Sequence, residues 1–216
     1  MTENRFLYCW FDTEYTTLDL NQAQLLQIAL IVTDDNLIPI PLSPKNFPGE
    51  LLRQDGFSAF IKPPPRKNIS EHVLENYQPL LTRCESDGIN VDAADELLTS
   101  YLNHLPETRA SNIQHRPIMA GNTIHADYFL SRKYLPRFTS LLNYRIFDVS
   151  TLKLEWLFHY RGTPFKKKDN AKNIQRYYKG KDKILGNQHD AYYDIQASMA
   201  ELAFYRTKIS FMADGQ

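Results

Sequence analysis

The chain has 216 residues, of which 43% are hydrophobic, so it is long enough for one domain with an apolar core and short for two. Lysine plus arginine and aspartate plus glutamate balance at 25 each, which argues against a protein that coats nucleic acid non-specifically, because such proteins are usually basic. No run is apolar enough to cross a membrane, and the N-terminus does not have the pattern of a signal peptide. Cys9 and Cys84 lack metal-type spacing, and Cys9 in its apolar strand is expected to be a core thiol, which favours a reducing compartment. We therefore expect a cytoplasmic protein with no membrane partner.

The first apolar run ends in two carboxylates, Asp12 and Glu14. Side chains alternate between the faces of a strand, so these two acids point the same way. Buried charges are costly unless they are paired or bind a metal, and two oxygen ligands side by side suit magnesium or manganese. The pair by itself is also typical of solvated acids at a strand end, so other residues must decide between the two interpretations.

Two more strands follow in the first third of the chain. Residues 25–33 are apolar and β-branched, which predicts a central strand antiparallel to the first. Two prolines restrict residues 37–42 to an edge or a loop, and residues 43–57 are predicted as a surface loop. Residues 57–61 form a third predicted strand, which three consecutive prolines end.

Helices and strands alternate after that point. Ser70 is a predicted N-cap for a helix that Pro79 must kink or end, and Asp92 is a predicted cap for the next helix. Further predicted elements are a strand over 117–121, a helix over 125–130, a strand over 145–149, a helix over 150–160 capped by Ser150, and a last helix from about residue 190. This order predicts an α/β fold, with a mixed five-stranded sheet flanked by helices.

Residues 162–188 are polar and basic. Eight lysines and arginines face two aspartates there, a local excess of six positive charges. The segment either contacts a nucleic-acid backbone or is a solvated insertion that lysine keeps soluble, and the sequence favours neither. Residues 170–178 are predicted to form an amphipathic helix, with Ile174, Tyr177 and Tyr178 packing down. We therefore expect one domain over residues 1–216 with a basic insertion at about 162–188.

Two more acidic positions stand at the edges of predicted elements: Asp127, early in a helix, and Asp194, near the start of the last helix. His189 precedes Asp194 by five residues, about 140° around a helix, so it is expected on the preceding loop. Four carboxylates can hold two divalent ions, and a histidine nearby can take a proton from water. Taken singly, each residue also fits an ordinary role as a helix-start acid, a loop histidine or a surface acid.

Three motifs follow one another along the chain: Asp12-X-Glu14, the segment G-N-T-I-H-A-D ending at Asp127, and His189-X4-Asp194. In the order of these motifs and in the residues beside them, the chain resembles the DEDDh exonucleases. Within these the chain is most similar to the oligoribonucleases, through residues 10–19, 27–34, 121–136, 144–152 and 189–206. The resemblance implies an RNase H-like fold, two divalent metal ions (Mg²⁺ or Mn²⁺), and a homodimer. It also implies 3′-to-5′ release of 5′-mononucleotides from short single-stranded RNA, down to dinucleotides.

The resemblance also assigns roles to residues that match the family's motifs. Asp12, Glu14, Asp127 and Asp194 would be metal ligands, and His189 the general base. The implied substrate-binding residues are Leu18 as a wedge against the bases, Tyr77 as a base-stacking ring, Tyr144 reaching the partner subunit's site, and Thr123, Arg145 and Ser150 as a cap on the substrate's 5′ phosphate.

Some positions depart from the family pattern. Thr17 stands where the family has glycine, Thr123 where it has serine, and Tyr77 where it has tryptophan. The histidine that follows the tryptophan in the family has no clear counterpart, and Glu85 lies nearest. The sequence therefore leaves open a DEDDh exonuclease that acts on longer RNA or single-stranded DNA through the basic segment, and an inactive nucleic-acid-binding module.

Overall fold

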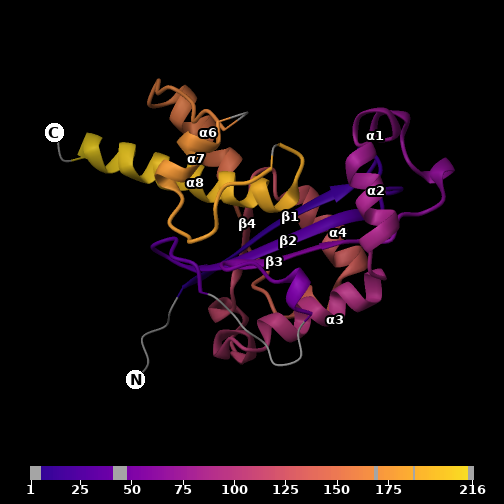
Figure 1. Ribbon diagram of the computed structural model, residues 1–216. Coiled ribbons are helices and arrows are strands. Elements are labelled where there is room, and N and C mark those ends of the chain that lie inside the picture. Colours follow the sequence, from indigo (N-terminus) through magenta and orange to yellow (C-terminus); the bar gives the residue numbers. More distant parts are fainter. Residues whose placement is uncertain (1–5, 41–47, 168–169, 187, 214–216) are drawn as a thin grey trace.

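The computed structural model describes residues 6–40, 48–167, 170–186 and 188–213, the side chains of 210–213 excepted. Its centre is one sheet with the strand order β3-β2-β1-β4-β5 (Figure 1). The strands are β1 (Leu7–Tyr15), β2 (Leu25–Asp34), β3 (Gly56–Phe60), β4 (Ile118–Gly121) and β5 (Ile146–Asp148). The first three are antiparallel, and β4 and β5 run parallel to β1, so the predicted mixed five-stranded sheet is confirmed.

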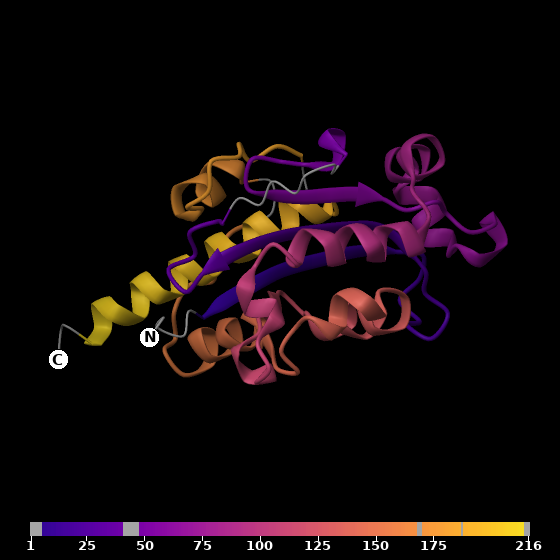
Figure 2. The ribbon, with the colours of Figure 1, turned by 90° about the horizontal axis from the view of Figure 1, so that it is seen from below.

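Alternation along β1 divides the core into two layers. Leu7, Cys9 and Phe11 pack on one face against α3 (Val91–Leu102), α4 (His125–Tyr134) and α5 (Pro136–Ser140). Trp10 packs on the other face against α6 (Val149–Phe158), α7 (Ala171–Tyr177) and α8 (Ala191–Ala213). Figures 1 and 2 show the sheet between these two sets of helices. Asp12 and Glu14 share the parity of Trp10 and therefore face α8.

The predicted helix over 70–81 is two helices, α1 (Glu71–Asn76) and α2 (Gln78–Asp87), because Pro79 lies in the first turn of the second. Ser70 is the N-cap of α1, as predicted, and its Oγ accepts a hydrogen bond from the Val73 amide at 3.4 Å. Four short 3₁₀ turns complete the described elements: Gly49–Leu51, Arg66–Asn68, Pro106–Arg109 and Ile113–His115.

Two predicted helix caps are wrong. Asn90 caps α3, since its Oδ1 accepts from the amide of Asp92, which lies in the first turn. Asp148 caps α6, since its Oδ1 accepts from the Ser150 amide at 2.8 Å. In both cases the helix begins one or two residues earlier than predicted, and the Asn or Asp directly before it is the N-cap in place of the predicted Asp92 or Ser150. The Ser150 hydroxyl is thereby free to bond a different segment.

The basic segment is fastened to the sheet by two aspartates. The buried Asp55 carboxylate accepts from the Tyr178 hydroxyl at 2.8 Å and from the amides of Lys181 and Asp182 at 2.6 and 2.7 Å. Asp182 in turn accepts from the Asp55 amide at 3.0 Å and from the Tyr192 hydroxyl at 2.6 Å. We call this pair the Asp55–Asp182 latch. The predicted helix over 170–178 is present as α7, and Ile174 within it and Tyr178 at its end are buried.

Among the helices of the described ranges, none combines the length and the apolar character that a membrane crossing requires.

Candidate active site

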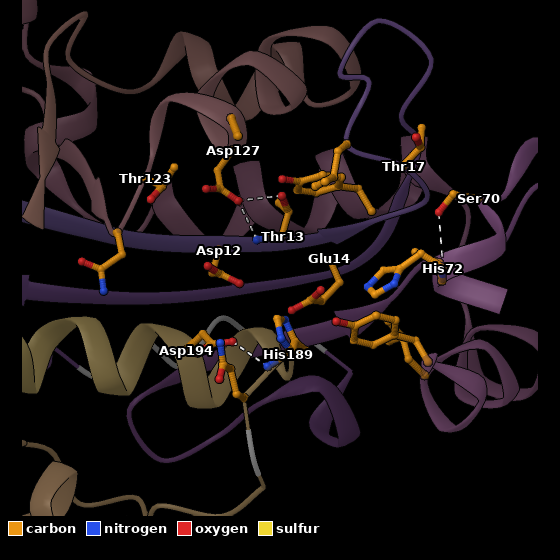
Figure 3. A pocket seen from close by; sticks show the side chains of 18 of the residues that line it. Asp12, Thr13, Glu14, Thr17, Ser70, His72, Thr123, Asp127, His189 and Asp194 are labelled. Atoms are coloured by element: carbon orange, nitrogen blue, oxygen red, sulfur yellow. Dashed lines mark hydrogen bonds between the residues drawn. The ribbon is translucent and has the colours of Figure 1, made fainter. Parts of the chain in front are cut away.

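A pocket of about 590 Å³ opens beside the end of β1 (Figure 3). Its lining includes all five groups that the motifs single out: Asp12, Glu14, Asp127, His189 and Asp194. They come from β1, from α4, and from α8 with the loop before it, which are separated along the chain and meet only in the folded protein. The volume lies within the range that small-molecule sites occupy.

The start of α8 brings two of these groups to β1. The Asp194 side chain in the first turn accepts a hydrogen bond from the backbone amide of His189 at 2.8 Å, which closes the loop in front of the helix. One ligand atom each of Glu14, His189 and Asp194 lies within 4.8 Å of the others. His189 lies before the helix, as predicted, and its φ of 72° is left-handed. Strain of this kind is concentrated at functional sites in proteins.

Asp127 enters the pocket from α4 and is fixed by β1. Its Oδ1 accepts from the Thr13 amide at 2.8 Å and from the Thr13 hydroxyl at 2.7 Å (Figure 3). Thr13 lies between Asp12 and Glu14 in the strand, so one stretch of three residues supplies two acids and positions a third. Charge-assisted hydrogen bonds of this kind hold a carboxylate in one orientation.

Burial raises the pKa of all four acids, and repulsion from the other site acids adds to the shift at Asp12 and Glu14. Burial lifts the pKa of Asp12 well above its usual range, and the nearby Asp127, Asp194 and Glu14 add to the shift. The pKa of Glu14 is raised to about 8, mainly by burial and further by repulsion from Asp194 and Asp127. Burial also raises the pKa of Asp127 and Asp194, although the Thr13 hydrogen bonds oppose it at Asp127. Crowded, desolvated carboxylates of this type are stabilised by a divalent cation, and oxygen donors are the ligands that such cations prefer. The residues present therefore fit a divalent-metal site.

The predicted substrate residues divide into two groups. Leu18, Tyr77 and Thr123 line the pocket, and the Leu18 side chain is 86% exposed at its rim. Tyr144 and Arg145 do not line it; both are exposed, and the Arg145 guanidinium lies 5.0 Å from the centre of the Tyr144 ring.

Ser150 does not line the pocket but contacts Thr123, which does. Its Oγ accepts from the Thr123 amide at 2.9 Å and lies 3.2 Å from the Thr123 hydroxyl. Asp148 accepts from the same amide at 2.9 Å. These contacts hold Thr123 at a φ of 56°, a left-handed conformation that a β-branched residue rarely adopts. Thr17, by contrast, has no positive φ, so this loop does not require the family's glycine.

The structure also places residues in the pocket that the sequence patterns did not single out. His72 lines the pocket from α1, and its ring centre lies 5.7 Å from that of Tyr77, which in turn lies 5.2 Å from that of His189. Glu85, the nearest counterpart in sequence to the family's histidine, pairs with Arg66 on the surface at 3.6 Å instead. Lys167, Asn122 and Ser198 are further lining residues. The sequence offered only one signal for His72, its place two residues after the Ser70 N-cap, in the first turn of α1.

No protein-family model matches the chain. It is similar to the oligoribonuclease of Tropheryma whipplei, with 27% identity over 91% of this chain and 90% of the relative. It is also similar to that of Francisella tularensis (28%, over 93% and 94%) and to a probable oligoribonuclease of Schizosaccharomyces pombe (28%, over 92% and 66%).

Solved structures of exonuclease I have a similar fold. The Escherichia coli enzyme in complex with a dA16 oligonucleotide aligns with a TM-score of 0.61 and 16% identity, over 97% of this chain and 42% of that one. The enzyme of Methylocaldum szegediense aligns with a TM-score of 0.57 and 18% identity, over 94% and 41%. The chain thus spans less than half the length of these structures. The RNase H-like fold is confirmed, and so is the predicted resemblance to the oligoribonucleases, which extends over at least 91% of this chain for the three relatives.

Proposed function

We propose that this chain is a metal-dependent 3′-to-5′ exoribonuclease that degrades short RNA oligonucleotides, down to dinucleotides, to 5′-mononucleotides. The observation that carries the proposal is the convergence of four carboxylates and a histidine in one pocket, from β1, α4, α8 and the loop before α8. Similarity to oligoribonucleases along most of the chain supports RNA as the substrate.

In this proposal Asp12, Glu14, Asp127 and Asp194 hold two divalent cations, Mg²⁺ or Mn²⁺. Their burial and mutual repulsion support it, because a bound cation relieves both. Such a pair supplies activation of water and stabilisation of charge on the leaving oxygen of a phosphodiester. Thr13 orients Asp127 through two hydrogen bonds and is a positioning residue.

His189 is the proposed general base. Histidine exchanges protons near neutral pH, and the loop before α8 places its ring beside Glu14 and Asp194. A neutral ring nitrogen takes a proton from the attacking water as its oxygen bonds to phosphorus. The bond from phosphorus to the 3′ oxygen of the preceding nucleotide breaks, and that oxygen takes up a proton from solvent. The products are a 5′-mononucleotide and a shortened chain with a 3′ hydroxyl.

The terminal bases are held by apolar and aromatic side chains. Exposed Leu18 wedges between bases, and Tyr77 stacks on one of them with His72 beside it. Thr123 supplies a hydroxyl for the proposed phosphate cap, and Ser150 holds Thr123 in place. Arg145, which is exposed outside the pocket, completes the cap by its charge and fork geometry only when its side chain turns toward the bound phosphate. Because Tyr144 and Arg145 lie outside this chain's pocket, we assign Tyr144 to the partner subunit's pocket in a homodimer.

The exposed surface of β5 and α6 supports a homodimer. Ile146, Leu154 and Phe158 line one groove there, and their side chains are 37%, 51% and 67% exposed. β5 is also the edge strand of the sheet and adjoins Tyr144 and Arg145. Exposed apolar patches of this kind are typical of contact surfaces between protein chains.

A second candidate is an exonuclease for longer RNA or single-stranded DNA. The excess of six positive charges in residues 162–188 suits it if this segment contacts a nucleic-acid backbone, and an exonuclease that was solved with a dA16 oligonucleotide has a similar fold.

A length series separates these candidates. Labelled RNA of two, three, five, seven and twenty nucleotides, and DNA of the same lengths, is incubated with Mg²⁺, with Mn²⁺ or with EDTA. We expect metal-dependent cleavage that slows steeply beyond the dinucleotide. Rates that stay level or rise with length favour the second candidate, and the absence of metal-dependent cleavage at every length leaves an inactive binding module.

A further inference from the structure

One lysine of the basic segment lies inside the acidic pocket. Lys167 is the only lysine or arginine among the described residues that line it. We propose that the Lys167 ammonium binds the phosphate group that is cleaved, and so is a catalytic residue that every substrate meets, whatever its length. The proposal rests on the exonuclease function proposed above and adds a substrate contact to it.

The backbone around Lys167 is held on both sides. Phe165 is buried against Phe204 of α8, with the ring centres 5.4 Å apart. The buried Tyr193 of α8 donates its hydroxyl to the Lys167 carbonyl at 3.0 Å. Lys166 between them is exposed, and its carbonyl accepts from Asn173 at 2.8 Å. In a stretch without helical structure, this alternation turns Lys167 inward and Lys166 outward.

A buried glutamate forms a long ion pair with the Lys167 ammonium but accepts no hydrogen bond from it. Glu201 of α8 is fully buried, and its two oxygens accept from the Asn122 side chain at 2.9 Å and from the Tyr205 hydroxyl at 2.8 Å. Lys167 Nζ lies 4.0 Å from Glu201 Oε2, which is beyond hydrogen-bond distance. The Lys167 side chain is only 27% exposed. Its three N–H groups are therefore held near the acids and have no hydrogen-bond acceptor among the described residues.

A phosphate is the ligand that matches this arrangement. Two divalent cations would do no more than balance the charge of the four carboxylates, so an anionic phosphodiester gains from a further positive charge in the pocket, and Lys167 supplies it. A lysine supplies a point charge with several donors to the non-bridging oxygens, and it also stabilises charge that develops on them during hydrolysis. Lys179 of the same segment, in contrast, already donates to the Asn36 carbonyl at 2.8 Å and lies outside the pocket lining.

The test compares Lys167→Met with Lys166→Met, which removes a neighbouring charge on the outward side, and with Lys167→Arg, which keeps the charge. Adenosine 5′-monophosphate and adenosine are titrated into each protein with saturating Mn²⁺, and Mn²⁺ is titrated alone. Thermal unfolding of each variant shows that it is folded. Turnover of a dinucleotide and of a seven-nucleotide RNA is measured in parallel.

We expect Lys167→Met to weaken binding of the monophosphate by about ten- to a hundredfold, as for a lost charged hydrogen bond, and to leave the weak binding of adenosine unchanged. Binding of Mn²⁺ alone stays the same or tightens, because a competing positive charge is gone. Turnover falls by the same factor on both RNA lengths, Lys166→Met resembles the wild type, and Lys167→Arg retains most of the affinity.

Three results overturn the proposal: unchanged affinity for the monophosphate, a loss confined to the longer RNA, or a loss of Mn²⁺ affinity as large as the loss of nucleotide affinity. The last would show that Lys167 organises the acids. A wild-type protein that cleaves no RNA, yet loses monophosphate binding on Lys167→Met, would refute the exonuclease function while keeping the phosphate contact.

Discussion

At the scale of single residues, the pocket gathers negative charge where water reaches it poorly. The pKa of Glu14 is raised from 4.5 to about 8 by burial and by Asp194 and Asp127. The folded, metal-free chain therefore binds a proton there more tightly than the unfolded chain does. Linkage requires the free energy of unfolding to fall as pH rises from about 4.5 to about 8.

The first prediction tests this repulsion. In EDTA we expect the wild type to be less stable at pH 8 than at pH 5.5, by on the order of 2 kcal/mol, and Glu14→Gln to remove much of that difference. Urea unfolding at both pH values measures it. With saturating Mn²⁺ the trend should reverse, since protons compete with the cation. A wild type with the same stability at both pH values in EDTA would contradict the electrostatic account.

The second prediction concerns Asp12. Asp12→Asn keeps the shape of the side chain and removes one buried charge, so we expect the metal-free protein to unfold at the same temperature or higher. Metal-dependent cleavage should be abolished, and the rise in unfolding temperature on adding Mn²⁺ should shrink. Calorimetry with and without Mn²⁺ measures the two unfolding temperatures, and a cleavage assay measures turnover. Near-normal turnover would remove Asp12 from the metal site.

The third prediction separates the ring of His189 from its backbone. His189→Ala should lower turnover by about 10² to 10⁴, as for a lost general base, with Mn²⁺ affinity largely kept. Because φ is 72° at this position, His189→Gly is the matched control: it relieves the strain and should lose as much turnover. If His189→Gly were as active as the wild type, the ring would have no part in proton transfer.

At the scale of elements, the site depends on how segments are fastened to the sheet. The Asp55–Asp182 latch ties the basic segment to β3, and Tyr193 ties Lys167 to α8. The fourth prediction is that Asp55→Ala destabilises the protein by about 2–4 kcal/mol, because three hydrogen bonds to a buried carboxylate are lost. Hydrogen exchange should speed up in residues 178–184 while β1 and β2 stay protected.

The exposed Glu75 of α1 offers the control for that experiment, since Glu75→Ala removes an acid that makes no such contacts. Uniform acceleration of exchange over the whole sheet in Asp55→Ala would show that the latch supports the core instead of the basic segment. Turnover should fall together with local protection, because the latch lies on the segment that presents Lys167.

At the scale of the whole molecule, the apolar groove between β5 and α6 is the surface that we propose for a homodimer. The fifth prediction is that Phe158→Glu converts the proposed homodimer into a monomer. Light scattering after size-exclusion chromatography measures the molar mass that distinguishes the two. Leu185→Glu, at a residue that is 72% exposed elsewhere, should leave the assembly intact. Turnover should fall with dimerisation if the partner subunit's Tyr144 completes each pocket. A monomeric variant with full turnover would show that one chain suffices.

Several features follow from the sequence by itself, because they depend on local periodicity. Alternation along β1 places Asp12 and Glu14 together, and it does so in the structure. The helical spacing of Ile174 and Tyr178 predicts α7 and its buried face. The five motif residues could also be identified before the fold was known, since their order along the chain is itself the resemblance to the oligoribonucleases.

Other features were decided only by the tertiary structure, because they depend on which distant segments become neighbours. Thr13 binds Asp127, 114 residues away, and Ser150 holds Thr123 instead of capping α6. His72 and Lys167 occupy the pocket although neither belongs to a motif, and Glu85 does not. Periodicity tells which way a side chain points from its own strand or helix. What it meets there is fixed by strand pairing and loop closure, which bring residues from across the chain to the same end of the sheet.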